Sequence, residues 1–261
     1  LSKIYRQAES SHIVLNAHKI NAGELITLNN KNKDFFFFEK QDVRSVMGAL
    51  IYLVKTKLPE YIGTSPFEIQ VLTPMRKGEL GVEHLNEVLQ YYLNPASESK
   101  KEKEGRTGVF REGDKVMQVK NNYKLEWKIT NAKGFSVEEG LGVFNGDMGV
   151  IKQINTYSER ITVVFDENRE VEYPYSNLDE LELAYAITIH KSQGSEYPAV
   201  VLPLLSGPPI LCNRNLLYTA ITRAQKCAAI VGRQSMVEQM IHNETEQKRY
   251  SGLNECLKDG I

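Results

Sequence analysis

The sequence lacks the features that mark secreted, disulfide-bonded and membrane proteins. Its 261 residues hold only three cysteines, Cys212, Cys227 and Cys256, without CxxC or CxxH spacing. That number and spacing exclude a disulfide framework and indicate no zinc site. No apolar run approaches the roughly 20 residues that span a bilayer, and no signal-peptide pattern opens the chain. These absences predict a protein of the reducing cytoplasm that has no membrane partner.

An excess of charge of either sign is also missing. The 32 basic and 33 acidic side chains give a formal net charge of −1, which excludes a polybasic, histone-like binder. Hydrophobic residues make up 41% and charged residues 25%, so disorder is excluded as the main state. The length is typical of one or two domains. Because the chain starts at Leu1 rather than at methionine, we expect a fragment of a longer polypeptide.

The phosphate-binding motif GxxxxGK followed by Ser or Thr is absent as well. Its loop, lysine and hydroxyl cradle nucleotide phosphates, so we expect the isolated chain not to hydrolyse ATP. Residues 161–167 (ITVVFDE) imitate the acidic Walker B strand that accompanies this motif. Asn168 follows directly, however, and residues 169–173 alternate as a returning strand. We therefore interpret Asp166, Glu167 and Asn168 as the turn of a β-hairpin.

Apolar periodicity places helices and strands along the chain. From Asp42, apolar residues at helical spacing predict a helix that ends before Pro59. Residues 68–73 are typical of a short strand closed by Pro74, and a second helical pattern includes Leu85, Val88, Leu89 and Tyr92. Further on, the expected strands are 183–189, 199–205 and 227–231, and the expected helices are 216–224 and 236–241. This alternation predicts an α/β fold with a parallel sheet.

The middle of the chain differs in character. Residues 95–108 (PASESKKEKEGRTG) are poor in apolar side chains, which predicts a solvated linker or mobile loop at a domain boundary. Short runs with partial alternation follow between Gly, Asn and Asp turns, at 114–120, 148–154, 160–165 and 169–173. They predict a small β-barrel inserted into the α/β domain. The resulting parts are residues 1–108, 109–179 and 180–261.

Three stretches carry side chains suited to phosphate chemistry. The loop at 188–196 offers hydroxyls, an imidazole, an ammonium and backbone N–H groups beside a glycine. On composition alone, an ordinary polar loop between buried strands is an equally good interpretation. Arg223 lies near the end of a predicted helix, where interaction with the helix dipole is the simpler account. Tyr5 beside Arg6 pairs an aromatic plane with a planar cation.

Together and in this order, these stretches resemble motifs IV, V and VI of superfamily 1 helicases, specifically the RecD-like branch of subfamily 1B. The matching segments are residues 4–21, 71–86, 188–196 and 216–224. The resemblance implies the second of two RecA-like α/β domains, with ATP between the pair and single-stranded DNA across their tops. The inserted part at 109–179 then resembles an SH3-like barrel, and the family implies 5′ to 3′ translocation.

The resemblance also implies roles for single residues. Arg6 and Arg223 match two arginines that reach the γ-phosphate, where charge accumulates during phosphoryl transfer. Tyr5 matches an aromatic residue near adenine, and Gly194 and Glu196 match the nucleotide side of the loop, with Glu196 near the ribose. The implied DNA contacts are Pro74, Met75, Thr188, His190, Lys191, Ser192 and Gln193. The implied ligands are single-stranded DNA and ATP with Mg²⁺, the nucleotide being held mainly by a missing N-terminal motor domain of the same polypeptide.

The sequence is also compatible with a different class of protein. A stand-alone nucleic-acid-binding or adaptor module would carry a degenerate RecA-like domain and a barrel that binds a partner. Retention of Arg6, Glu196 and Arg223 favours the helicase. Among the aromatic residues, Trp127 and Phe135 are better explained by packing in the insertion than by base stacking. The four phenylalanines of residues 35–38 predict a strand covered on both faces, or one that packs on the missing domain.

Overall fold

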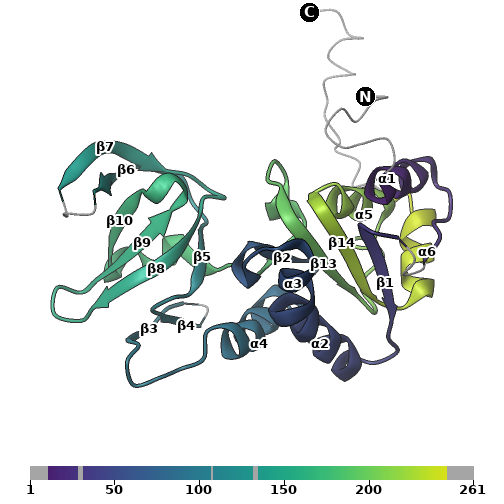
Figure 1. Ribbon diagram of the computed structural model, residues 1–261, viewed down its shortest axis with the longest axis horizontal. Coiled ribbons are helices and arrows are strands. Elements are labelled where there is room, and N and C mark those ends of the chain that lie inside the picture. Colours follow the sequence, from purple (N-terminus) through teal and green to yellow (C-terminus); the bar gives the residue numbers. More distant parts are fainter. Residues whose placement is uncertain (1–10, 29–31, 107, 132–134, 246–261) are drawn as a thin grey trace, which may run out of the picture.

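The computed structural model describes residues 11–28, 32–106, 108–131 and 135–245. Tyr5, Arg6 and Cys256 lie outside these residues. In Figure 1 a mixed layer of helices and strands stands beside a second part built almost entirely of strands. The α/β fold predicted from the sequence is confirmed, and the β-rich part falls in the middle of the chain, as expected.

The first sheet has five strands in the order β1-β14-β13-β2-β12. Every neighbouring pair in it is parallel, which confirms the predicted parallel sheet. Because parallel strands are usually covered on both faces, their sequences are nearly continuous runs of apolar residues. The strands are β1 (Phe35–Glu39), β2 (Ile69–Thr73), β12 (Ala186–Thr188), β13 (Tyr197–Leu204) and β14 (Ala224–Gly232).

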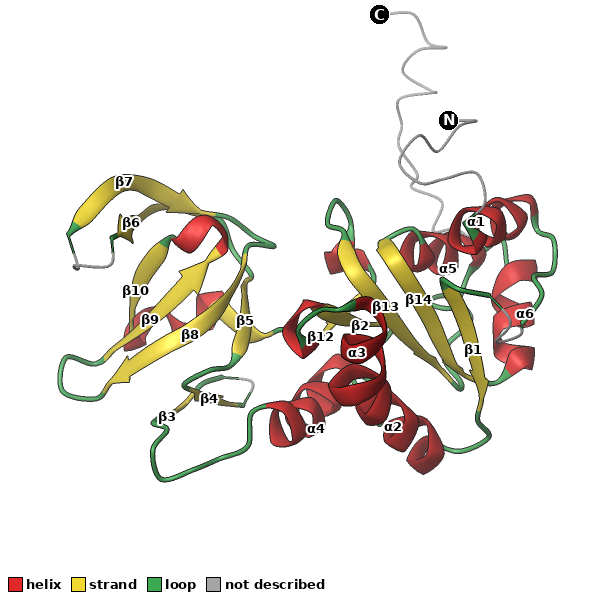
Figure 2. Cartoon of the chain, in the orientation of Figure 1, coloured by secondary structure: helices red, strands yellow, loops and turns green. Residues whose placement is uncertain are grey.

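Helices cover both faces of this sheet (Figures 1 and 2). One face packs on α1 (His12–Ala22), α5 (Arg214–Ile221) and α6 (Gln234–His242), and the other on α2 (Val43–Tyr52), α3 (Leu58–Ile62) and α4 (Val82–Leu93). The phenylalanine run of β1 follows this division. Phe35 and Phe37 belong to the first core, whereas Phe36 and Phe38 pack against the second. The expectation that both faces of this strand are covered is therefore confirmed.

The helix that begins after Asp42 continues past the proline at which we expected it to end. The Asp42 carboxylate caps it by accepting a 2.9 Å hydrogen bond from the Ser45 backbone N–H. A π-helical stretch, Leu53–Lys57, then leads into α3, which begins one residue before Pro59. A proline in the first turn of a helix removes no hydrogen bond that the turn requires. The helix instead ends at Gly63, whose φ of +67° favours glycine.

The second sheet has seven antiparallel strands in the order β11-β5-β8-β9-β10-β6-β7. The predicted turn at Asp166–Asn168 is confirmed, since β9 and β10 pair across it. Among the pairings of the described residues, β11 and β7 remain at the two edges, so closure into a barrel is not seen. The strands are β5 (Lys115–Gln118), β6 (Asn122–Thr130), β7 (Ser136–Val143), β8 (Met148–Asn155), β9 (Arg160–Phe165), β10 (Glu170–Pro174) and β11 (Leu181–Leu183).

Two connections between the sheets differ from expectation. Part of the predicted linker is ordered as β3 (Glu102–Glu104), which pairs with β4 (Val109–Arg111). An ion pair of 2.6 Å between the Arg111 Nε and a Glu102 carboxylate oxygen reinforces this hairpin. The strand expected at 183–189 is divided between β11, which pairs with β5, and β12, which pairs with β2. The seven-stranded sheet therefore extends to Leu183.

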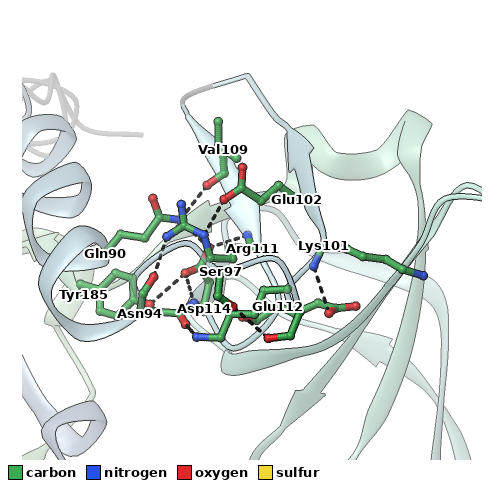
Figure 3. A network of polar contacts seen from close by, with 12 residues as sticks. Gln90, Asn94, Ser97, Lys101, Glu102, Val109, Arg111, Glu112, Asp114 and Tyr185 are labelled. Atoms are coloured by element: carbon green, nitrogen blue, oxygen red, sulfur yellow. Dashed lines mark hydrogen bonds and ion pairs between the residues drawn. The ribbon is translucent and has the colours of Figure 1, made fainter.

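A buried carboxylate joins the two sheets (Figure 3). Asp114 has no exposed surface and precedes β5 directly. It accepts hydrogen bonds from Gln90 (2.6 Å) and Asn94 (2.7 Å), which come from α4 and its end, and from the Tyr185 hydroxyl (2.9 Å) just before β12. The backbone N–H of Arg111 adds a fourth bond at 2.6 Å. Burial raises the pKa of Asp114 although these donors act in the opposite direction.

Lys115 forms a second connection. It is buried, and its Nζ donates to the Phe67 carbonyl at 2.7 Å and to the Gln70 side-chain oxygen at 2.8 Å. Both acceptors precede or belong to β2 of the parallel sheet, whereas Lys115 begins β5 of the antiparallel sheet. Burial lowers the pKa of Lys115 to about 7. At neutral pH this contact is therefore sensitive to protonation.

We predict that Asp114→Asn lowers the free energy of unfolding by about 1–3 kcal/mol. Whichever way the new amide is placed, its NH₂ group faces two of the four donors that now share the carboxylate. Urea unfolding checks this, with Asp179→Asn as the control, because Asp179 is 46% exposed and bonded to Lys120 at the surface. Equal stability of the two variants would contradict the assigned role of Asp114.

We also predict that the free energy of unfolding depends on pH because of Lys115. The unfolded lysine keeps a pKa near 10.5 and the folded one is about 7, so between these values the unfolded chain holds the extra proton. The free energy of unfolding then rises with pH, by up to about 1.4 kcal/mol per pH unit. Between pH 7.5 and 9.5, the slope of the unfolding free energy against pH should disappear in Lys115→Met. It should remain in Lys124→Met, the control at an exposed lysine. An unchanged slope in Lys115→Met rules out the assignment.

Candidate functional site

The residues expected to contact DNA gather at the carboxyl edge of the parallel sheet. β2 and β12 are neighbours, and their last residues, Thr73 and Thr188, lie level with each other. The chain leaves β2 through Pro74 and Met75 and leaves β12 through the loop at 188–193. The Ile189 N–H donates to the Thr73 carbonyl at 3.1 Å, which fixes the two exits together. The fold thus brings together two predicted segments that are far apart in the sequence.

Within this loop the side chains differ in how available they are. His190 and Gln193 are exposed, whereas Thr188 and Lys191 are half-buried. Ser192 is fully buried, and its hydroxyl donates to the Ile189 carbonyl at 2.6 Å, so that this hydroxyl holds the turn. The exit from β2 is less exposed, since Pro74 is buried and Met75 half-buried.

A carboxylate that the motifs did not indicate lies between these two segments. Glu182, on β11, has a side chain only 11% exposed and accepts from Arg76 at 2.6 Å and from Lys191 at 3.0 Å. Bonds from these two cations lower the pKa of Glu182 despite its burial, which acts in the opposite direction. Arg76 follows Met75 directly, so Glu182 connects both exits to the antiparallel sheet.

Arg223 lies at the opposite, amino edge of the sheet. The predicted helix at 216–224 ends at Ile221, so Arg223 occupies the turn between α5 and β14. Its guanidinium donates to the Thr219 carbonyl (3.2 Å), to the Ser195 carbonyl (3.0 Å) and to the Thr222 hydroxyl (3.3 Å). All three acceptors are uncharged. In the described part of the chain no carboxylate forms an ion pair with Arg223.

The other residues expected near a nucleotide lie close to this arginine. Glu196 is exposed just before β13 and accepts a 3.3 Å hydrogen bond from Gln225 at the start of β14. The Tyr197 N–H donates to the Arg223 carbonyl at 2.8 Å, which holds the starts of the two strands together. Gly194 is exposed with a φ of +90°, a conformation that favours glycine. Tyr5 and Arg6 are not among the described residues.

A cleft opens between this edge and the antiparallel sheet. Its volume is about 580 Å³, and Ser195, Glu196 and Tyr197 line one side of it. Lys115, Asp147 and Asp166 are among the residues that line the other side. The cleft therefore lies between residues 195–197 and the inserted sheet.

Neither cysteine nor metal chemistry is indicated by the described residues. Cys212 and Cys227 are free and buried, and burial raises the pKa of both thiols. Within the same part of the chain, no three His, Cys, Asp or Glu side chains are grouped to hold a metal ion. None of the helices described there has the length and apolar character needed to cross a membrane.

Two family models match the chain. The model described as the ATP-dependent RecD-like DNA helicase SH3 domain matches residues 85–165, and that of the UvrD-like helicase C-terminal domain matches residues 183–231. The first covers much of the antiparallel sheet. The second contains the loop at 188–196, the arginine at 223 and most of β13 and β14.

Curated relatives agree with these models. The chain is 34% identical over 225 residues to the ATP-dependent RecD2 DNA helicase of Deinococcus radiodurans, an alignment that covers 86% of this chain and 27% of that protein. It is 30% identical over 191 residues to the RecBCD enzyme subunit RecD of Mycolicibacterium smegmatis, covering 73% of this chain and 29% of that one. The chain thus spans less than a third of the length of either relative.

Solved structures support the fold. A Pif1 helicase from Bacteroides in complex with ADP-AlF3 and single-stranded DNA aligns with all of this chain and 56% of its own, at 17% identity and a TM-score of 0.51. A second Bacteroides Pif1 structure bound to single-stranded DNA aligns with 98% of this chain and 55% of its own, at 16% identity and the same TM-score of 0.51. These likenesses confirm a RecA-like fold. The motif resemblance, the two family models and the curated relatives all agree, and the chain belongs to the RecD-like helicase family.

Proposed function

We propose that the chain forms the second motor domain of an ATP-dependent DNA helicase that moves 5′ to 3′ along single-stranded DNA. In this proposal it contacts DNA at the carboxyl edge of its parallel sheet and reaches the nucleotide from the amino edge. The ATP, with its Mg²⁺, is held mainly by a first motor domain of the same polypeptide. The names of the relatives and the fold likeness support the general class, and the geometry of the two edges supports the detailed roles.

One observation carries the proposal. The single segment at 189–196 leaves the carboxyl edge beside Thr73 and arrives at the amino edge beside Arg223. Its first half holds the residues that the motifs relate to DNA, and its second half holds those related to the nucleotide. In this proposal a change at either ligand is transmitted to the other along these eight residues. Coupling of this kind is what an ATP-driven translocase requires.

The chemistry of Arg223 suits the nucleotide side. Charge spreads over the equatorial oxygens in the transition state of phosphoryl transfer, and an arginine supplied from a facing domain is worth roughly 10³–10⁵ in rate. The three hydrogen bonds of Arg223 go to uncharged oxygens, so they orient the guanidinium without neutralising it. We assign the same role to Arg6, and we place Tyr5, Gly194 and Glu196 beside the base and sugar of the nucleotide.

The carboxyl edge suits a single strand of any sequence. His190 and Gln193 are exposed there, and Lys191 adds a cation. Contacts to phosphate carry no sequence information, as translocation demands. A few such contacts are compatible with the formal net charge of −1, since binding depends on the local potential. We assign Pro74, Met75 and Thr188 to the same surface, and Ser192 to the support of the loop.

We predict that Arg223→Ala, in a polypeptide carrying both motor domains, lowers the rate of DNA-stimulated ATP hydrolysis at least a hundredfold, in line with what such arginines contribute. Steady-state phosphate release at saturating DNA and ATP checks this, with thermal unfolding to show that the fold is intact. The control Lys226→Ala removes an exposed cation from the adjoining strand, β14, and should change the rate less than twofold. An unaffected rate in Arg223→Ala would contradict the assignment.

A further inference from the structure

Glu182 holds two cations that come from different exits of the parallel sheet. Its Oε1 is 2.6 Å from the Nη2 of Arg76, and its Oε2 is 3.0 Å from the Nζ of Lys191. Because both cations contact one carboxylate, they are neighbours at the carboxyl edge. The more distant Arg106, whose Nη2 is 3.9 Å from Oε1, adds a third positive charge. The local charge is therefore positive even with Glu182 ionised.

Both cations keep donors that Glu182 does not use. A guanidinium has five N–H donors, of which Arg76 directs one toward Glu182, while its Nε lies 3.4 Å from Glu83. An ammonium has three donors, and Lys191 gives one of them to Glu182. The side chains are 41% and 28% exposed respectively, so the unused donors are accessible to a ligand. A phosphate group can thus bind without displacing the carboxylate.

We propose that Arg76 contacts a phosphate of the DNA strand and that Glu182 is the positioning residue that aligns Arg76 with Lys191. The inference rests on the proposed single-strand site at the carboxyl edge and adds to it a residue that no motif indicated. Long cationic side chains lose much conformational freedom when they bind. Glu182 restrains both before DNA arrives, so less freedom is lost on binding. Because Glu182 belongs to β11, the inserted sheet helps to build the DNA site.

The first test compares two charge-neutralising variants in one loop. We measure the affinity of the 261-residue chain for a fluorescently labelled oligothymidylate by anisotropy at several salt concentrations. Arg76→Gln should weaken binding five- to tenfold and reduce the slope of log affinity against log salt by about 0.7, the value for one phosphate contact on a single strand. The matched control Lys77→Gln, an exposed neighbour, should change affinity less than twofold. Equal effects of the two variants overturn the role of Arg76.

Glu182→Gln tests positioning against simple electrostatics. Removing a negative charge beside the strand would by itself tighten binding, whereas loss of alignment weakens it. We expect affinity at least threefold weaker in Glu182→Gln. The loss should be smaller when Glu182→Gln is added to Arg76→Gln, because Glu182 then has only Lys191 left to position. Unchanged or tighter binding overturns the role of Glu182. Thermal unfolding establishes whether each variant is folded. If Glu182→Gln does not fold, the comparison of Arg76→Gln with Lys77→Gln still tests the phosphate contact of Arg76.

His190→Ala separates this inference from the proposed function. That variant removes an exposed loop side chain that Glu182 does not touch, and we expect it to weaken binding. If His190→Ala binds the oligothymidylate more weakly while Arg76→Gln binds it as tightly as the unaltered chain, only the present inference is overturned. If the unaltered chain does not bind the oligothymidylate, the proposed single-strand site and the inference are both overturned.

Discussion

Parallel pairing of every strand in the five-stranded sheet is the constraint on which the site depends. A chain that leaves a parallel strand at the carboxyl edge must return to the amino edge before the next strand begins. Thr188, where the chain leaves β12, lies level with Thr73 at the end of β2. Ala199 lies level with Ile69 at the start of β2, and Tyr197, where β13 begins, is two residues further back. With a rise of about 3.3 Å per residue and a spacing of about 4.8 Å between strands, the chain must travel roughly 20 Å along the strands and about 10 Å across β2 between Thr188 and Tyr197.

Only residues 189–196 are available for that return. Fully extended, the step from Thr188 to Tyr197 reaches about 30 Å, so the segment has little slack even before its helical turn at His190–Ser192 is counted. The buried hydroxyl of Ser192 closes that turn, and Gly194 adopts a positive φ where the chain resumes its extended course. A tight connection of this kind transmits displacement from one edge to the other. In the proposed function, this connection is what would let one short motif serve both DNA and nucleotide.

Much of this could be predicted from residue patterns. The apolar strands of the parallel sheet and the turn at Asp166–Asn168 depend on local sequence, and the motifs identified the loop at 188–196. Three strands of the insertion, β4, β6 and β7, were not predicted, although apolar and polar residues alternate through residues 123–129 of β6. The prediction that the helix ends before Pro59 was wrong, because a π-helical stretch places that proline in the first turn of α3.

Contacts between distant residues could not be predicted in this way. Glu182 and Arg76 are 106 positions apart, and the four hydrogen bonds to Asp114 come from three separate elements. Neither carboxylate belongs to a recognisable motif, because each is defined by what the fold brings to it. The division of residues 183–189 between two sheets has the same origin, since only pairing with β5 or β2 decides where each residue belongs.

The most direct measurement of the central claim is the stimulation of ATP hydrolysis by single-stranded DNA in Gly194→Ala, made in a polypeptide with both motor domains. Gly78, after β2, is the matched control: φ is +90° at Gly194 and +97° at Gly78, and a Cβ at either position meets no atom within 4 Å. Both alanines therefore introduce backbone strain alone. We predict that the ratio of rates with and without DNA falls toward one in Gly194→Ala and is kept in Gly78→Ala. Equal ratios in the two variants would contradict the account of residues 189–196 as the link between the two edges.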